Sequence, residues 1–316
     1  MPTYPGQSGD LTKIQMDVLL KQPQLISRSL VNLVSKRLGA YKMCVVDQTP
    51  MVCASILYQQ YESIYLDRDP AVASPRSKWP RTSWTEEAKS AAITEHGLEV
   101  VINNLAIRLN QKPQLTIALR KLANNIIRWV DGGLLDTILA TAMGTQTMNA
   151  SAVWTAAATD IIGDIGEAQE KIETEDNGYD GFENALLVLN TVHRNSLLSN
   201  TALRAALPRE SSTGSIQTGK VAPFLGIKDI LYLSEMPQSK ALVLDNTVAL
   251  MMQGSEPVAE EGFQRHPDDL PGALPIWVKT YKEEPKDTII AGGIWPALAS
   301  VAPRAIVRID GISATT

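Results

Sequence analysis

A long apolar stripe of helical spacing constrains this chain more than any other feature. Between residues 113 and 143, apolar side chains recur in steps of three and four: Leu115, Leu119, Leu122, Ile126, Val130, Leu134 and Ile138. This period places them on one face of an α-helix, and Pro113 suits the first turn because its missing N–H needs no partner there. A continuous helix would extend roughly 45 Å, so the fold must offer a long apolar surface beside it.

Two adjacent glycines, Gly132 and Gly133, interrupt the second half of this stripe. Glycine within a helix costs about 1 kcal/mol relative to alanine, so the pair needs a reason. One explanation is close packing of the helix against another backbone. The other is a hinge, at which the helix can bend. Both residues are therefore hinge candidates.

The remaining periodicity predicts a mixture of helices and strands. We expect helices at 27–38, 161–172 and 191–207, the second with Asp160, Asp164, Glu167 and Glu170 off its apolar face. An uninterrupted apolar run at 185–190 is typical of a buried strand. Further strands are expected at 98–109, 227–234, 240–244 continuing into 247–252, 275–281, 288–292 and 303–312.

Residues 61–92 form a segment of different character. The segment has three prolines, dense charge and two tryptophans, Trp79 and Trp84, and too few aliphatic residues for a core strand or helix. A disordered linker would explain this composition. Tryptophan is, however, common where a surface docks on another protein, which favours an extended segment that becomes ordered on a neighbour.

Charge and motifs exclude several classes of protein. Residues 1–150 hold 16 basic and 12 acidic side chains (net +4) and residues 151–316 hold 13 and 22 (net −9), so the whole chain, at −5, is not a typical nucleic-acid binder. No run of about 18 apolar residues predicts a membrane span, and residues 1–25 have no continuous apolar core of the kind that a secretory signal needs. Two cysteines are too few for a disulfide framework, which indicates a reducing compartment.

Catalytic constellations are scarce for a chain of this length. The three histidines, His96, His193 and His266, are isolated from one another and from cysteine. Residues 214–220 match GxxxxGK, but Val221 replaces the Ser or Thr that a phosphate-binding loop needs for Mg²⁺. We therefore expect no cofactor, no metal site and no enzyme activity.

The order of these parts resembles that of a known family. The stretches that carry the resemblance are SAAITEHGLEVVINNLAIRL, PQLTIALRKLANNIIRWVDGGLLDTI, GFENALLVLNTVHRNSLLSN, GKVAPFLGIKDILYLSEMPQSKALVLD and WPALASVAPRAIVRIDGI. In this order they resemble the major capsid protein of tailed bacteriophages, whose α+β fold is shared with encapsulin shells and the floor of herpesvirus capsids. The resemblance covers nearly the whole chain as an order of elements.

The resemblance implies a division of the chain. Its parts would be an N-terminal arm (1–48), an extended loop over the next subunit (49–96), a peripheral domain with the spine helix (97–149), an axial domain (150–280) and closing strands of the peripheral domain (281–316). The intersubunit contact candidates that follow are Asp67, Arg68, Arg76, Lys78, Trp79, Arg81, Trp84, Glu86, Glu87 and Lys89 in the loop, and Lys282, Glu283, Glu284 and Lys286 near threefold contacts.

The implied function is structural. The chain would self-assemble into pentamers and hexamers of an icosahedral phage capsid that encloses double-stranded DNA, assembled in the host cytoplasm and carried in the virion. Expected partners are a separate scaffolding protein, a portal and, as a further candidate, a decoration protein. The net-positive arm would lie inward, in weak and nonspecific contact with packaged DNA.

Two other functions remain open on the sequence. An encapsulin shell has the same fold and encloses protein cargo instead of DNA. An α/β enzyme would use carboxylates such as Asp160, Asp164 or Asp245 and would remain a small oligomer.

Overall fold

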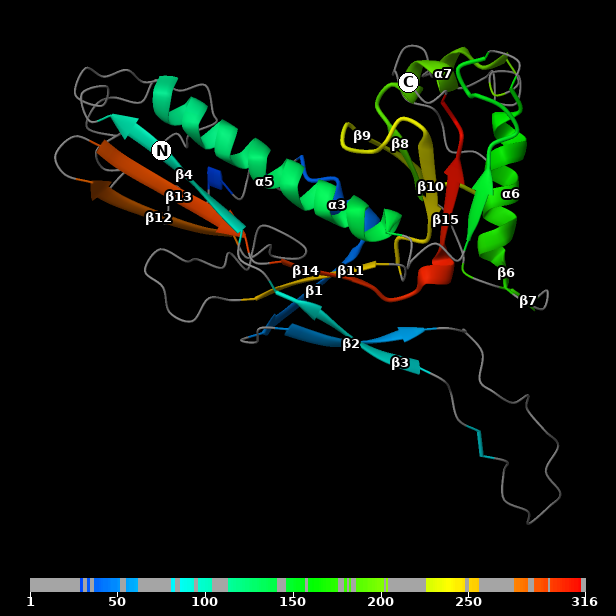
Figure 1. The fold of residues 1–316 in the computed structure, drawn as a ribbon, viewed down its shortest axis with the longest axis horizontal. Coiled ribbons are helices and arrows are strands. Elements are labelled where there is room, and N and C mark those ends of the chain that lie inside the picture. The colour runs from blue at the N-terminus through cyan, green and yellow to red at the C-terminus, as the bar shows by residue number, and fades with distance from the viewer. Residues whose placement is uncertain are drawn as a thin grey trace.

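The long helix α5 (Pro113–Leu139) crosses much of the molecule in this computed structural model (Figure 1). The structure describes residues 29–30, 33–34, 37–51, 55–61, 81–82, 86–93, 96–103, 113–140, 146–156, 159–175, 179–180, 182, 186–201, 203, 226–247, 250–255, 276–283, 287–294 and 296–313. The helix ends earlier than the predicted residue 143. Its predicted apolar stripe is confirmed where side chains are described, since six of its members are buried: Leu119, Leu122, Ile126, Val130, Leu134 and Ile138.

A three-stranded antiparallel sheet lies along α5. Its order is β12 (Ile276–Glu283), β13 (Asp287–Ile294) and β4 (His96–Asn103). The contact between sheet and helix is close, because a Cβ placed on Gly292 of β13 would lie 2.8 Å from Leu122 Cδ2. At the start of β4, the His96 ring stacks on Trp129 of α5 with 3.7 Å between ring centroids.

A second sheet joins three distant parts of the chain. Its order is β1 (Val45–Met51), β11 (Leu250–Ser255) and β14 (Pro296–Ser300). Strand β1 runs parallel to β11, and β11 runs antiparallel to β14. The short helix α3 (Ala40–Met43) leads into β1, and the helical residues before it bury Leu30 and Val34 in the core.

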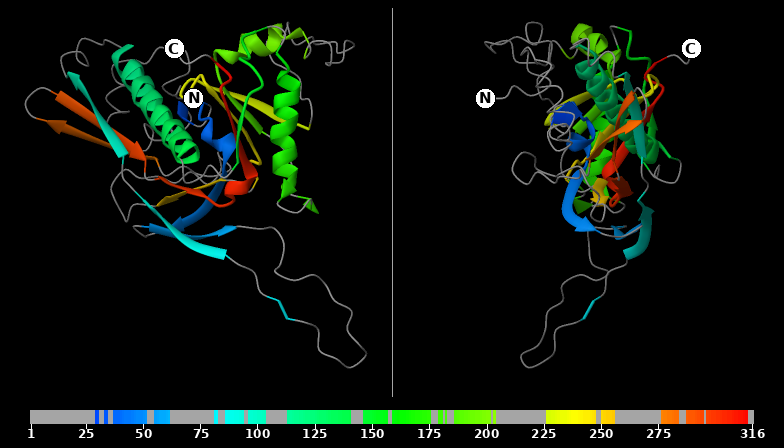
Figure 2. Two further views of the ribbon diagram at one scale, coloured as in Figure 1. Left: turned by 45° about the vertical axis from the view of Figure 1, so that its right-hand side comes forward. Right: turned by 90° about the vertical axis from the view of Figure 1, so that its left-hand side faces the viewer.

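The third sheet forms the other end of the molecule, together with α6 (Ile161–Glu173) and α7 (His193–Ser199) (Figures 1 and 2). Its order is β5 (Thr147–Asn149), β15 (Ile306–Asp310), β10 (Lys240–Leu244), β8 (Leu186–Asn190) and β9 (Asp229–Leu233). Helix α6 packs on β15 and β10 through its predicted apolar face. Every residue of β8 is buried, as the apolar run predicts. The small elements β6 (Thr174–Glu175), β7 (Tyr179–Asp180) and η2 (Pro303–Ala305) lie at this end of the chain's fold as well, and a two-stranded sheet is described below.

The topology corrects three sequence expectations. The last strand, β15, pairs with β10 and β5. Of the strands expected within residues 281–316, β13 therefore completes the sheet along α5 and β15 does not. Strand β11 does not continue β10 but lies in another sheet. Val192 is 52% exposed instead of lying on a buried helical face, because α7 begins only at His193.

Asp164 is a further correction, because its carboxylate is buried. Oδ2 accepts a hydrogen bond of 2.7 Å from Trp154 Nε1, and Oδ1 accepts one of 2.9 Å from the backbone N–H of Ser151. Both donors belong to the segment that leads from β5 toward α6. A buried carboxylate is tolerated where its oxygens satisfy buried donors, so Asp164 fixes this segment on the helix.

We expect Asp164→Ala to lower the free energy of unfolding by about 2–4 kcal/mol, because it leaves the Trp154 indole N–H buried without its acceptor. Urea unfolding of the unassembled chain measures the change. Glu167→Gln is the matched control on the same helix, since Glu167 forms only an exposed i,i+4 pair with Lys171 and should change stability by less than about 0.5 kcal/mol. Equal effects of the two substitutions would contradict the buried role of Asp164.

Cys44, directly after α3, has a buried thiol. Burial, and secondarily the Asp131 carboxylate, raise the pKa of this thiol to about 12. The thiol stays protonated in the folded chain at pH values where an unfolded chain forms thiolate, so stability should fall as the pH rises from 9 toward 12.

In a Cys53→Ser background, which leaves Cys44 as the one cysteine of the chain, we expect iodoacetamide to modify Cys44 in urea but not in native buffer at pH 8. Mass spectrometry of the intact protein measures the modification. Equal rates of alkylation in the two conditions would overturn the placement of this thiol in the core.

Candidate assembly surfaces

A two-stranded antiparallel ribbon lies on the side of the body next to β14 (Figures 1 and 2). It consists of β2 (Ser55–Tyr61) and β3 (Glu86–Ala92), with a register that runs from Ser55 opposite Ala92 to Tyr61 opposite Glu86. Tyr61 and Glu86, the residues on either side of the segment 62–85, are therefore adjacent at one end of the ribbon. The sequence predicts no core strand within residues 61–92. Strand β3 does lie within this range, but it belongs to the ribbon and to none of the three larger sheets.

The two faces of the ribbon differ. The inner face carries Ile56 and Gln60, both buried, and the Gln60 side-chain amide donates to the Ser300 carbonyl of β14 over 3.5 Å. The outer face carries Leu57, whose side chain is 79% exposed, together with Gln59, Ala88 and Ser90. The ribbon is thus attached to the body on one side, and on the other it presents uncharged side chains to solvent, with Leu57 as the large apolar one.

The sheet along α5 also has an exposed face. On the side away from the helix, Val101 is 58% exposed and Tyr281 is 38% exposed, and the Tyr281 hydroxyl donates to Glu99 Oε1 over 2.5 Å. The turn between β12 and β13 follows, where Lys282 pairs in register with Thr288 and Glu283 with Asp287. This face combines apolar and charged groups at the edge of the subunit.

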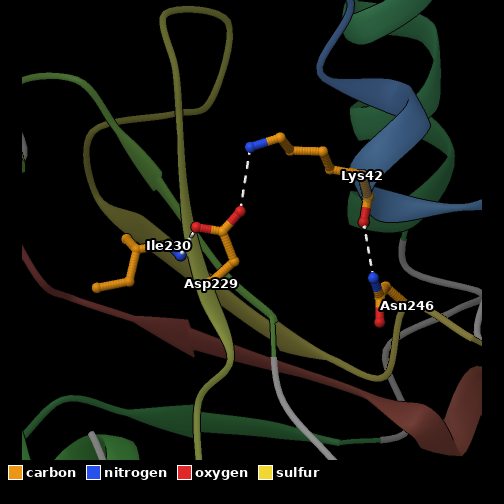
Figure 3. Close-up of polar contacts among 4 residues, drawn as sticks. All are labelled: Lys42, Asp229, Ile230 and Asn246. Carbon is orange, nitrogen blue, oxygen red and sulfur yellow. Dashed lines mark hydrogen bonds and ion pairs between the residues drawn. The ribbon is translucent and has the colours of Figure 1, made fainter. Parts of the chain in front are cut away.

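The residues around α3, just before β1, are attached to two parts of the body. The Gly39 N–H donates to Asp131 Oδ2 of α5 over 3.2 Å, and this bond is buried. On the other side, Lys42 Nζ lies 3.0 Å from Asp229 Oδ2, and Asn246 Nδ2 donates to the Lys42 carbonyl over 3.2 Å (Figure 3). The Lys42–Asp229 pair is exposed and contributes little by itself, so the buried apolar residues and the Gly39 bond provide most of the attachment.

The predicted contact residues divide into two groups. Lys89 lies half-buried on β3 and Arg81 is exposed, whereas for Glu86, Glu87, Lys282 and Glu283 the structure describes the strand but not the side chain. The others lie outside the described residues: Asp67, Arg68, Arg76, Lys78, Trp79, Trp84, Glu284 and Lys286. Sequence reasoning missed Leu57 and Ile56, although the alternation of side chains in SILYQQY is a signal for a two-faced strand.

The hinge candidates Gly132 and Gly133 lie within the continuous helix α5. A Cβ on Gly132 would meet nothing within 4 Å, and one on Gly133 would meet only Leu298 Cδ1, at 3.7 Å. Within the described part of the chain, close packing against a backbone therefore does not require either glycine. The hinge remains a prediction.

The carboxylates of the enzyme alternative have structural partners. Asp160 caps α6 by accepting from the Gly163 N–H over 2.9 Å, and Asp245 accepts from the backbone N–H and hydroxyl of Thr247. Asp164 accepts from Trp154 and Ser151, as described above. Among the described residues there is no group of three or more metal-ligating side chains, and no helix there is long and apolar enough to span a membrane.

A similar arrangement of sheets and long helix occurs in solved structures of protein shells. The chain resembles the capsid of cyanophage P-SCSP1u (TM-score 0.60, 13% identity, 87% of this chain and 88% of that chain) and a virus-like particle from Pyrococcus furiosus (TM-score 0.60, 14%, 90% and 98%). It also resembles the SrpI encapsulin of Synechococcus elongatus PCC 7942 (TM-score 0.57, 11%, 88% and 89%). At these identities the likeness shows the fold, which is the predicted α+β capsid fold.

The family is shown by sequence. Residues 86–309 match the family model described as phage capsid protein, so the chain belongs to the phage capsid protein family. No curated protein matches the chain in sequence. The chain is thus a capsid shell subunit, and its family and structural neighbours point to a structural, non-enzymatic role.

We expect Gly132→Ala and Gly133→Ala each to raise the free energy of unfolding by about 0.5–1 kcal/mol, because alanine has the higher helix propensity and finds space at both positions. Urea unfolding of the unassembled chain measures both. Gly292→Ala is the contrasting control, since its Cβ would collide with Leu122 and should destabilise by about 1–3 kcal/mol. If the double alanine variant assembles like the wild type, the glycines are not a hinge that assembly needs.

Proposed function

We propose that this chain is the repeating subunit of a closed icosahedral phage capsid, assembled from pentamers and hexamers around double-stranded DNA. The observation that carries the proposal is the match of residues 86–309 to the phage capsid protein family, in a chain whose β2–β3 ribbon has an exposed outer face. In the virion the protein would act with a separate scaffolding protein, a portal and, as a further candidate, a decoration protein. Assembly would take place in the host cytoplasm.

The ribbon supports this proposal through its geometry. Contacts around a ring are heterologous, so each subunit needs two different surfaces that complement each other. The outer face of the ribbon, with Leu57, is one such surface, and the exposed face around Val101 and Tyr281 is another. We infer that residues 62–85, which start and end at the tip of the ribbon, reach a neighbouring subunit.

The division of the chain is also part of the proposal. Residues 1–48 would be the arm, 49–96 the extended loop, and the sheet along α5 the peripheral domain. The five-stranded sheet with α6 and α7 would be the axial domain, which differs from the sequence expectation by including β15. The contact residues of the loop and of the β12–β13 turn would then lie at subunit boundaries, with Trp79 and Trp84 as buried anchors.

An encapsulin shell is the second candidate, favoured by the likeness to the SrpI encapsulin. The sequence match to the phage capsid protein family favours the phage capsid. Electron microscopy of the full-length chain, expressed together with the other structural proteins of its source, tests the shared proposal. A closed particle is expected, and a small oligomer under these conditions would overturn the proposal. Protein cargo in place of DNA inside the particle would favour the encapsulin.

We expect replacement of residues 62–85 by Asn-Gly to abolish closed particles while the subunit stays folded. The two-residue turn joins Tyr61 directly to Glu86, the last paired residues of the ribbon, so the deletion leaves the described register intact. Circular dichroism and urea unfolding measure folding, and light scattering measures assembly. Closed particles of this variant would contradict the intersubunit role of the segment.

A finer pair of variants tests the anchors themselves. Trp79→Ala with Trp84→Ala should impair assembly strongly, because large aromatic side chains dominate the energy of interfaces. Trp79→Phe with Trp84→Phe is the matched control, which keeps much of the aromatic area and should assemble better than the alanine pair. Equal assembly of the two variants would show that these tryptophans are not anchors.

A further inference from the structure

The first half of α5 presents a positively charged face to solvent. The side chains exposed along it are Ile117, Arg120, Lys121, Asn124, Asn125 and Arg128. At 100° per residue these positions occupy one side of the helix, opposite the buried stripe that contains Leu119, Leu122 and Ile126. No acidic residue lies between Pro113 and Val130 of the helix.

The cations of this face lack carboxylate partners in the described part of the chain. Arg120, Lys121 and Arg128 form no ion pair there, whereas the exposed Lys42 and Lys171 are paired with carboxylates. Isolated surface cations without counter-charges raise the local positive potential instead of cancelling it.

The N-terminal arm adds a fourth cation to the same face. Arg37 Nη1 donates to Asn124 Oδ1 of α5 over 3.0 Å, and the Arg37 side chain is exposed. Arg37, Arg120, Lys121 and Arg128 together form what we call the α5 basic stripe. From Arg120 to Arg128 the helix rises about 12 Å, a length over which duplex DNA presents roughly seven phosphate charges.

We propose that the α5 basic stripe is a contact surface for the phosphate backbone of the packaged DNA. This inference rests on the proposed function and moves the principal DNA contact from the arm as a whole to the spine helix and Arg37. Among the described side chains of this face of α5, the stripe is accompanied by the amides of Asn124 and Asn125 and by one exposed apolar side chain, Ile117. A docked protein would need an apolar core at this interface, which the stripe lacks, while a phosphate backbone needs only positive charge and donors.

The contact is sequence-independent and sensitive to salt. Each cation that neutralises a phosphate releases counterions and adds about 0.9 to the slope of log K against log salt. Removal of three cations should therefore reduce this slope by about 2–3 and weaken binding at least about tenfold at roughly 50 mM salt.

The test uses the full-length chain, at concentrations at which light scattering detects no particles, and a fluorescein-labelled DNA duplex. Fluorescence anisotropy over a range of salt compares the wild type with the triple variant Arg120→Gln, Lys121→Gln and Arg128→Gln. The control triple variant Lys171→Gln, Lys228→Gln and Lys279→Gln makes the same change in net charge away from α5. We expect loss of affinity and slope in the first variant and less than about a twofold change in the control.

Three outcomes overturn the inference: no duplex binding by the wild type, equal effects of the two triple variants, or a wild-type slope in the α5 variant. Poly-glutamate serves as a second probe. Binding of poly-glutamate that depends on the stripe more strongly than binding of DNA would identify an acidic protein segment as the partner and also overturn the inference. Particle formation, scored separately by electron microscopy, tests the proposed function, so a variant that assembles normally but binds DNA like the wild type refutes only the stripe.

Discussion

The packing of α5 along its buried side is the interaction on which the rest of the structure depends. Helix α5 contacts β4 and β13 of one sheet, β14 of a second sheet and the helix α3 of the arm. Each buried leucine or isoleucine of its stripe contributes about 1.5–3 kcal/mol through removal of apolar surface from water. Because the same helix supports both sheets, a shift of α5 would displace the ribbon beside β14 together with the sheet that contains Val101 and Tyr281.

One side of α5 is buried in the second half of the helix and exposed in the first half. In the second half, Asp131 and Leu135 are buried, and the Asp131 carboxylate accepts a hydrogen bond from the Gly39 N–H. In the first half the equivalent side of the helix is exposed and carries arginine, lysine and asparagine. The buried half therefore fixes the arm, and the charged half is left available for a partner outside the subunit.

Local pattern was sufficient to predict α5, α6, β8 and β10, because each buries a continuous stripe or run of side chains that the sequence displays directly. It failed where pairing partners are distant in sequence. Strand β1 pairs with β11, which lies some 200 residues further along the chain. Strand β15 pairs with β10 and not with a strand of the sheet that contains β13. No local sequence pattern indicates either pairing. Strand β3 was not predicted because its apolar residues are all alanines, which give no clear strand signal. The burial of Asp164 was not predicted because it depends on a hydrogen bond from one buried group, the Trp154 indole.

The ribbon illustrates how such a subunit can prepare for assembly. An isolated two-stranded ribbon is marginally stable in water, and this one is held to the body mainly through Ile56 and the bond from Gln60 to β14. Its outer face, with Leu57 mostly exposed, leaves apolar surface that a neighbour can cover. Contact with a neighbour would therefore stabilise the ribbon and bury Leu57 at once, which couples the final conformation of this part of the subunit to the formation of the shell.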